Sequence, residues 1–83
     1  ADALDAAREW RRDRPQDLLG ALLEARALLA LGKPAEADRV LGEVPESSEG
    51  LLLRAQAQRV LKRPKEAEKL YQRALVIKRA YNA

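Results

Sequence analysis

Cysteine, histidine, methionine, threonine and phenylalanine are absent from this chain of 83 residues, and aromatic residues make up only 4% of it. Without cysteine the chain has no disulfide framework and no thiolate nucleophile. Without histidine it has no imidazole base, and the usual zinc and copper ligands are missing as well. Carboxylates remain, but no segment has the clustered acidic spacing of a calcium loop. We therefore expect no metal site and no cofactor.

Groups suited to catalysis are equally scarce. The only serines are Ser47 and Ser48, which lie next to each other at a predicted helix start, where capping explains them. No base is available to activate either hydroxyl. Glu36 and Glu66 each follow a predicted turn, where the positive end of a helix dipole explains them. We expect the chain not to be an enzyme, and we assign no catalytic residue.

The composition favours one small helical domain. With 83 residues the chain can form a single modest core. Apolar residues make up 47% and charged residues 35% of the sequence, and the formal net charge is +3. Ala, Leu and Arg dominate while β-branched residues are scarce, which is a helix-forming mixture. No targeting segment is visible, and the missing initial Met suggests a piece of a longer protein. The sequence does not indicate a compartment.

The most apolar stretch runs from Leu18 to Leu31, and within it only Glu24 and Arg26 are charged. A helix that is apolar nearly all the way round must be covered by neighbours on several sides. The stretch is too short and too polar to cross a bilayer, so we expect no membrane insertion. We interpret it as the buried central helix of a small helical array.

This central stretch recurs later in the chain. Residues 20–41 align with residues 50–71 at a constant offset of 30, with nine identical pairs that include both a glycine and a proline. Carried back by one more period, Trp10 falls on Val40 and Pro15 falls on Pro45. A period of this length is typical of stacked supersecondary units. The single domain therefore divides into a half repeat (1–15), a first repeat (16–46) and a second repeat (47–83).

Capping and breaking residues predict five helices. Asp2 can cap a first helix that runs to about Asp13, and Pro15 ends it. Gly32 stops the central helix in the manner of a C-terminal glycine cap. Because the next connection is short, the third helix turns back antiparallel to the central one. A fifth helix starts at Pro64 and runs toward the end of the chain.

The fourth helix and the core positions follow from the same patterns. The segment 42–48 has loop composition, and Ser47 or Ser48 can cap a helix over 48–61. Trp10 is expected in core or end-cap packing. The other residues predicted to face inward are Leu4, Ala7, Ala37, Val40, Leu41, Val44, Leu51, Leu52, Ala55, Val60, Ala67, Leu70, Tyr71, Ala74 and either Ile77 or Lys78.

Ala25 lies twelve residues before Ala37, and Ala55 lies twelve residues before Ala67. This spacing of small residues resembles the tetratricopeptide repeat. In that family such residues sit where paired helices approach closely, and small side chains let helix axes come within about 8 Å. The resemblance covers residues 16–82 and implies an all-α fold, a fragment of a right-handed solenoid of antiparallel helix hairpins. The period is shorter than the family's usual length of about 34, and Ala21 and Leu51 replace its early aromatic.

The resemblance also implies a function. Stacked helix pairs form an extended curved surface, and in this family the first helix of each unit lines its concave side. We therefore predict a scaffold module that binds a protein or peptide partner in this groove. The implied groove residues are Leu19, Leu22, Arg26, Leu29, Glu49, Leu52, Gln56 and Arg59. The family's carboxylate clamp of paired Lys and Asn is absent, because Leu22, Arg26 and Leu52 occupy its positions.

Two alternatives stay open. In the fifth helix, apolar residues cover more of the circumference than packing against one neighbouring helix requires. This suggests self-association through Leu75, Val76 and Tyr81. Residues 42–83 hold nine basic and five acidic side chains, against seven and eight in residues 1–41. This excess suggests an acidic partner or RNA. The small number of aromatic residues argues against RNA or another nucleic acid, because the chain has no platform on which bases could stack.

Overall fold

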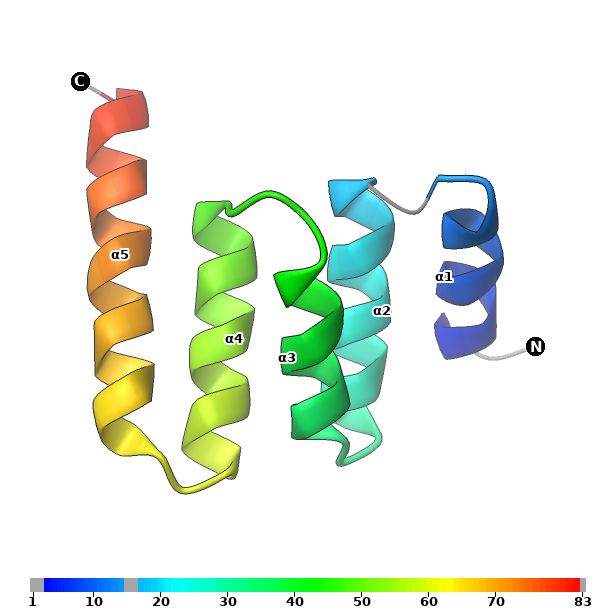
Figure 1. Ribbon diagram of the computed structural model, residues 1–83, viewed down its shortest axis with the longest axis horizontal. Coiled ribbons are helices and arrows are strands. Elements are labelled where there is room, and N and C mark those ends of the chain that lie inside the picture. The colour runs from blue at the N-terminus through cyan, green and yellow to red at the C-terminus, as the bar shows by residue number, and fades with distance from the viewer. Residues whose placement is uncertain (1–2, 15–16, 83) are drawn as a thin grey trace.

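The computed structural model describes residues 3–14 and 17–82, with side chains as far as residue 80. Over this part the chain is all-α with five helices and no strand, which confirms the predicted fold class. The helices stand side by side, each antiparallel to the one before it (Figure 1). They are α1 (Ala3–Arg12), α2 (Leu18–Ala30), α3 (Pro34–Gly42), α4 (Ser48–Val60) and α5 (Pro64–Asn82). The expected cap at Asp2 and the helix break at Pro15 lie outside the described residues.

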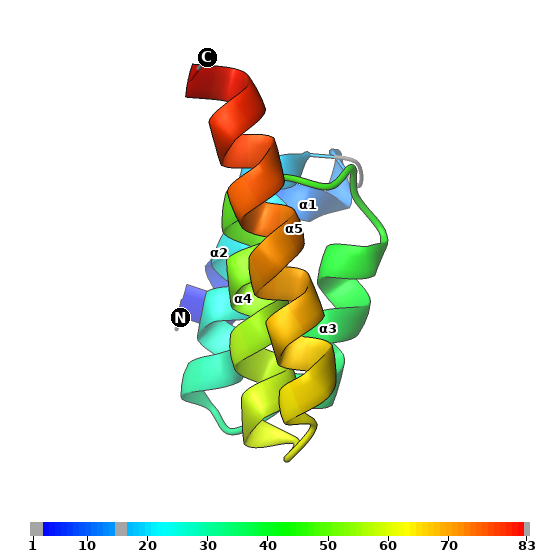
Figure 2. The same ribbon diagram turned by 90° about the vertical axis from the view of Figure 1, so that its left-hand side faces the viewer.

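Helix α2, like α4, packs against three of the other described helices. It packs against α1 and α3, which flank it in the sequence, and also against α4. Helix α4 in turn packs against α3 and α5. Viewed along the row of helices, α2 and α3 lie on opposite sides of it (Figure 2). Each helix hairpin therefore packs on the next one along the chain.

The core contains few large side chains and many small ones. Leu28 on α2 and Leu51 on α4 are the largest side chains that are fully buried. The predicted small residues are also buried, and these are Ala25, Ala37, Ala55 and Ala67. Because their side chains are short, the backbones of packed helices can approach closely. The core expected for the third helix is confirmed as well, since Val40, Leu41 and Val44 are buried.

Two of the core positions predicted on α4 are wrong. Leu52 is 42% exposed and Val60 is 62% exposed. The buried face of α4 carries Leu51, Ala55 and Gln58 instead, at the spacing of one helix face. Each residue advances about 100° around a helix, so Leu52 turns away from that face and Val60 lies opposite to it.

Neighbours cover α2 on several sides, as expected, but the cover is incomplete. Leu19, Leu23 and Leu31 are each about half exposed. Over the described residues α2 packs against three helices, and these cover the faces that carry Ala21, Ala25 and Leu28. Leu19, Leu23 and Leu31 stay at the surface because the described helices cover only part of their side chains. An apolar helix thus keeps an exposed stripe.

Trp10 lies at the surface, about half exposed, and not in the core. Its Nε1 donates a hydrogen bond to Asp17 Oδ2 at 2.6 Å, and the Arg14 guanidinium lies 4.7 Å from the ring centroid. Asp17 caps α2 and accepts a second hydrogen bond from Leu19 N at 3.0 Å. The hydrogen bond from Trp10 is the largest cause that holds the pKa of Asp17 below its ordinary value. Trp10 therefore ties the end of α1 to the start of α2.

The turns after α2 and α4 have the same geometry but different residues. In the first, Gly32 has φ of 75° and donates a hydrogen bond to Leu29 O, as expected for a glycine cap. In the second, Lys62 has φ of 62° and donates to Arg59 O. A side chain strains this left-handed conformation, because Cβ comes close to the following carbonyl oxygen. The second turn is therefore less stable than the first.

Replacing Lys62 by Gly should raise the free energy of unfolding by about 1 kcal/mol, because glycine adopts a positive φ without strain. Urea unfolding followed by helical circular dichroism measures the change. Lys65→Gly is the matched control: the same two residue types are exchanged in the first turn of α5, where glycine should lower stability. A loss of stability in the Lys62 variant as well would contradict the assignment of strain to this turn.

A candidate partner-binding groove

A shallow hollow of about 430 Å³ joins α2 to α4. Leu29 lines it from α2, and Gln56, Arg59 and Val60 line it from α4. Because α2 and α4 pack directly against each other, one rigid surface carries side chains from both repeats. The lining combines two aliphatic side chains, one amide and one guanidinium. This hollow between α2 and α4 is called the groove below.

The structure brings together three of the predicted groove residues, Leu29, Gln56 and Arg59. Leu19 and Arg26 are exposed on α2 but do not line the hollow itself. Glu49 and Leu52 are likewise exposed on α4. Leu22 is different, because it is buried in the main core cluster and cannot contact a partner. Its assignment to the groove is therefore wrong.

Val60 is the lining residue that the sequence reasoning missed. It was assigned to the core because it is apolar, yet its side chain is mostly exposed at the edge of the groove. It follows Gln56 by four residues, so both lie on the same face of α4. This spacing is the signal that could have placed Val60 beside Gln56.

Other apolar surface lies at the two ends of the row. Between α1 and α2 a hollow is lined by Ala7, Trp10 and Leu23, together with two further alanines. On α5, the self-association candidates Leu75 and Val76 are both more than half exposed. Tyr81, the third of these candidates, lies outside the residues whose side chains are described. Exposed apolar side chains therefore occur on both end helices.

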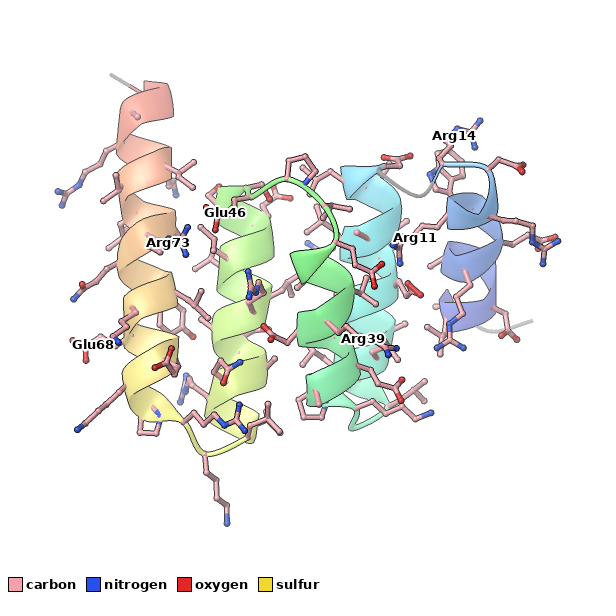
Figure 3. The ribbon with its side chains drawn as sticks, in the orientation of Figure 1. Arg11, Arg14, Arg39, Glu46, Glu68 and Arg73 are labelled. Carbon is pink, nitrogen blue, oxygen red and sulfur yellow. The ribbon has the colours of Figure 1, made fainter. Side chains whose placement is uncertain are left out.

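Some of the excess basic side chains in residues 42–83 form ion pairs with carboxylates of the chain. Arg54 pairs with Asp38 through Nε and Oδ1 at 2.9 Å. Arg73 turns toward Glu46 on the loop between α3 and α4 and pairs with it (Figure 3). Lys69 pairs with Glu66 at 3.7 Å, within α5. Three of the nine cations in this half thus contact carboxylates in the fold, which reduces the positive charge available to an acidic partner.

The most buried charge lies between α1 and α2. Glu24 is 6% exposed and pairs with both Arg8 and Arg11 of α1. Arg11, which Figure 3 shows between the two helices, also pairs with Glu43 at the end of α3, with Nη2 and Oε2 3.2 Å apart. This network connects three helices and is part of the fold, not of the groove.

Within the described ranges 3–14 and 17–82, no three acidic side chains gather in a way that could hold a metal ion. Over the same ranges none of the helices combines the length and the hydropathy needed to span a bilayer. Ser47 accepts a hydrogen bond from Gly50 N at 3.0 Å, which confirms its expected role as a helix cap.

The chain was compared with models of protein families, with curated protein sequences and with solved structures, and no match was found in any of the three. A functional conclusion has to come from the groove and from the exposed helix faces themselves.

Proposed function

We propose that this chain is a protein-interaction module, which binds a segment of a partner protein in the groove between α2 and α4. The observation that carries the proposal is the convergence of Leu29, Gln56 and Arg59 on one hollow. Half-buried and exposed aliphatic side chains in a hollow offer apolar area that a partner can cover. The arrangement also supports our proposal that the hairpins form a fragment of a solenoid similar to tetratricopeptide repeats.

The groove's side chains indicate what kind of segment it binds. Leu29 and Val60 suit an apolar side chain of the partner. Arg59 suits a carboxylate next to it, since guanidinium groups pair well with carboxylates. Gln56 has both a donor and an acceptor, and can therefore pair with a peptide backbone. The proposed ligand is a peptide with an acidic residue close to a large apolar one.

A random-peptide display selection on the immobilised chain tests this proposal. A selected peptide should bind about tenfold more weakly to Val60→Gln than to the original chain, because a central apolar contact is worth about 1–2 kcal/mol. Fluorescence anisotropy of the labelled peptide measures the affinity. Val76→Gln is the matched control, since Val76 is the same residue type as Val60, is exposed to a similar degree and lies on α5. If Val60→Gln leaves the affinity unchanged, the groove is not the binding surface.

Self-association through α5 is a second candidate function, and the exposure of Leu75 and Val76 favours it. A helix at the end of a row is expected to be polar outside, whereas both of these aliphatic side chains face solvent. Two copies paired along α5 would cover them. Sedimentation over a wide range of concentrations distinguishes this function, because self-association gives a dimer mass that Leu75→Gln lowers to the monomer mass.

A further inference from the structure

Two ion pairs occupy equivalent places in successive units of the chain. Arg8 on α1 pairs with Glu24 on α2, with Nε and Oε1 3.4 Å apart. Thirty residues later, Asp38 on α3 pairs with Arg54 on α4, with Oδ1 and Nε 2.9 Å apart. Each pair joins a helix to the next one in the row. The signs of the charges are reversed between the two pairs.

Glu68 is the next member of this series, thirty residues after Asp38. Figure 3 shows it on α5, on the side turned away from α4. Its side chain is exposed, and no ion pair to it is seen among the described residues. By analogy with Arg8 and Asp38, a partner for Glu68 would lie on a helix packed against the outer side of α5. None of the described helices lies there.

The apolar residues near Asp38 show how such a contact is built. Leu41 of α3 and Pro45 of the following loop line a small internal hollow together with Leu51 of α4. Leu51 precedes Arg54 by three residues, so both lie on the face of α4 that meets α3. The contact therefore combines one ion pair with an apolar seam one turn away.

Helix α5 carries the same combination on its outer side. Shifted by thirty residues, Leu41 and Pro45 become Tyr71 and Leu75. Leu75 is more than half exposed, while Tyr71, predicted to face inward, is only half-buried, at the border of the seam formed by Ala67 and Ala74. They follow Glu68 by three and seven residues, which is the spacing of one helix face. Glu68, Tyr71 and Leu75 are called the outer face of α5 below.

The connection that brings α4 onto α3 has no counterpart after α5. Residues 43–47 link α3 to α4, whereas residues 73–77 at the corresponding positions continue the helix. Helix α5 has 19 residues and α4 has 13, so the end of α5 projects past α4 in Figure 1. A helix on the outer face therefore cannot arrive through the short loop that the first repeat uses.

We propose that the outer face of α5 binds a helix of another protein, in which an apolar residue precedes an Arg or Lys by three positions. Helix α4 shows this arrangement within the chain, with Leu51 before Arg54. The apolar residue packs on Tyr71 and Leu75 while the cation pairs with Glu68. A helix with an acidic residue at the cationic position is disfavoured, because two carboxylates placed together repel each other. This surface is separate from the groove, so the inference does not depend on the proposed function.

A peptide of residues 48–61, acetylated and amidated at its ends, is the probe. It carries the α4 arrangement, and its matched control is the same peptide with Arg54→Glu. The chain should bind the arginine peptide about fivefold more tightly than the glutamate peptide, since a partly exposed ion pair contributes about 1 kcal/mol. The chain with Glu68→Arg should reverse that preference. Anisotropy of the labelled peptides measures all four affinities.

Two neighbouring substitutions locate the binding on α5. Leu75→Gln should weaken both peptides at least about fivefold, while Val76→Gln, one residue further along, should change neither. A preference for the arginine peptide that persists in the Glu68→Arg chain would overturn the proposal, since the peptide would then be replacing α4 inside the fold. Equal effects of the two glutamine substitutions would overturn it as well.

A second copy of the chain is the competing occupant of the outer face. If sedimentation without peptide shows a dimer that Leu75→Gln dissociates, and if the arginine peptide does not compete with it, the face belongs to self-association and the proposal fails. A monomer that binds the arginine peptide supports it. A selected peptide whose affinity falls in the Val60→Gln chain binds in the groove and not on the outer face of α5. The failure of one proposal can therefore be told apart from the failure of the other.

Discussion

Replacing Glu24 by Gln should lower the free energy of unfolding by about 3 kcal/mol, the largest effect we expect from any single change of charge. Glu24 is 6% exposed and balances both Arg8 and Arg11. Glutamine keeps the size of the side chain but removes the negative charge. Arg11, whose side chain is 12% exposed, then lies in the interface without its main counterion. Urea unfolding followed by circular dichroism measures the loss.

Glu43→Gln is the matched control for this prediction. Glu43 pairs with the same Arg11 at 3.2 Å, but its side chain is 55% exposed. Water and salt screen such a pair, so its loss should lower the free energy of unfolding by less than about 1 kcal/mol. If both variants lost a similar free energy of unfolding, the burial of Glu24 would not be the reason why its ion pairs stabilise the fold.

Leu28→Ala should lower the free energy of unfolding by about 3 kcal/mol, through lost apolar burial and the cavity left behind. Leu28 is one of the two largest fully buried side chains and lies in the main core cluster on α2. Its contacts belong to the folded state only, so the midpoint of urea unfolding should fall. The slope of the transition should stay the same, because the chain exposes similar surface on unfolding.

Leu23→Ala makes the same change on the exposed side of α2. Leu23 is about half exposed, so we expect a loss of less than about 1 kcal/mol in the free energy of unfolding. If the two alanine variants lost the same amount, α2 would be covered evenly by its neighbours. The stripe that includes Leu23 would then be part of the core in solution.

The sequence was sufficient to predict the helices and the turns. The offset of 30 residues places Gly32 and Pro34 in the first turn and Pro64 in the second, and the end of α2 and the starts of α3 and α5 follow from these residues. Capping depends on local chemistry, as the hydrogen bond accepted by Ser47 shows. Local features of this kind are readable without knowledge of the packing.

The sequence could not show how many neighbours each helix has. Leu52 and Val60 are apolar and were therefore assigned to the core, yet α4 turns them to the surface. Repeat position predicted Leu29, Gln56, Arg59 and Leu22 for the groove; the first three line one hollow, whereas Leu22 lies in the core. Helical periodicity gives the relative direction of side chains on one helix. It does not say which of those directions meets another helix.

The reversed charges of the two ion pairs also favour one order of the helices. If α4 docked on α1 in the place of α2, Arg54 would meet Arg8; if α2 docked on α3 through the face that contacts α1, Glu24 would meet Asp38. Like charges would repel in both mispaired arrangements, although the two repeats share several apolar residues. In a chain built from two similar halves, the signs of these charges thus favour the native order of the repeats over their exchange.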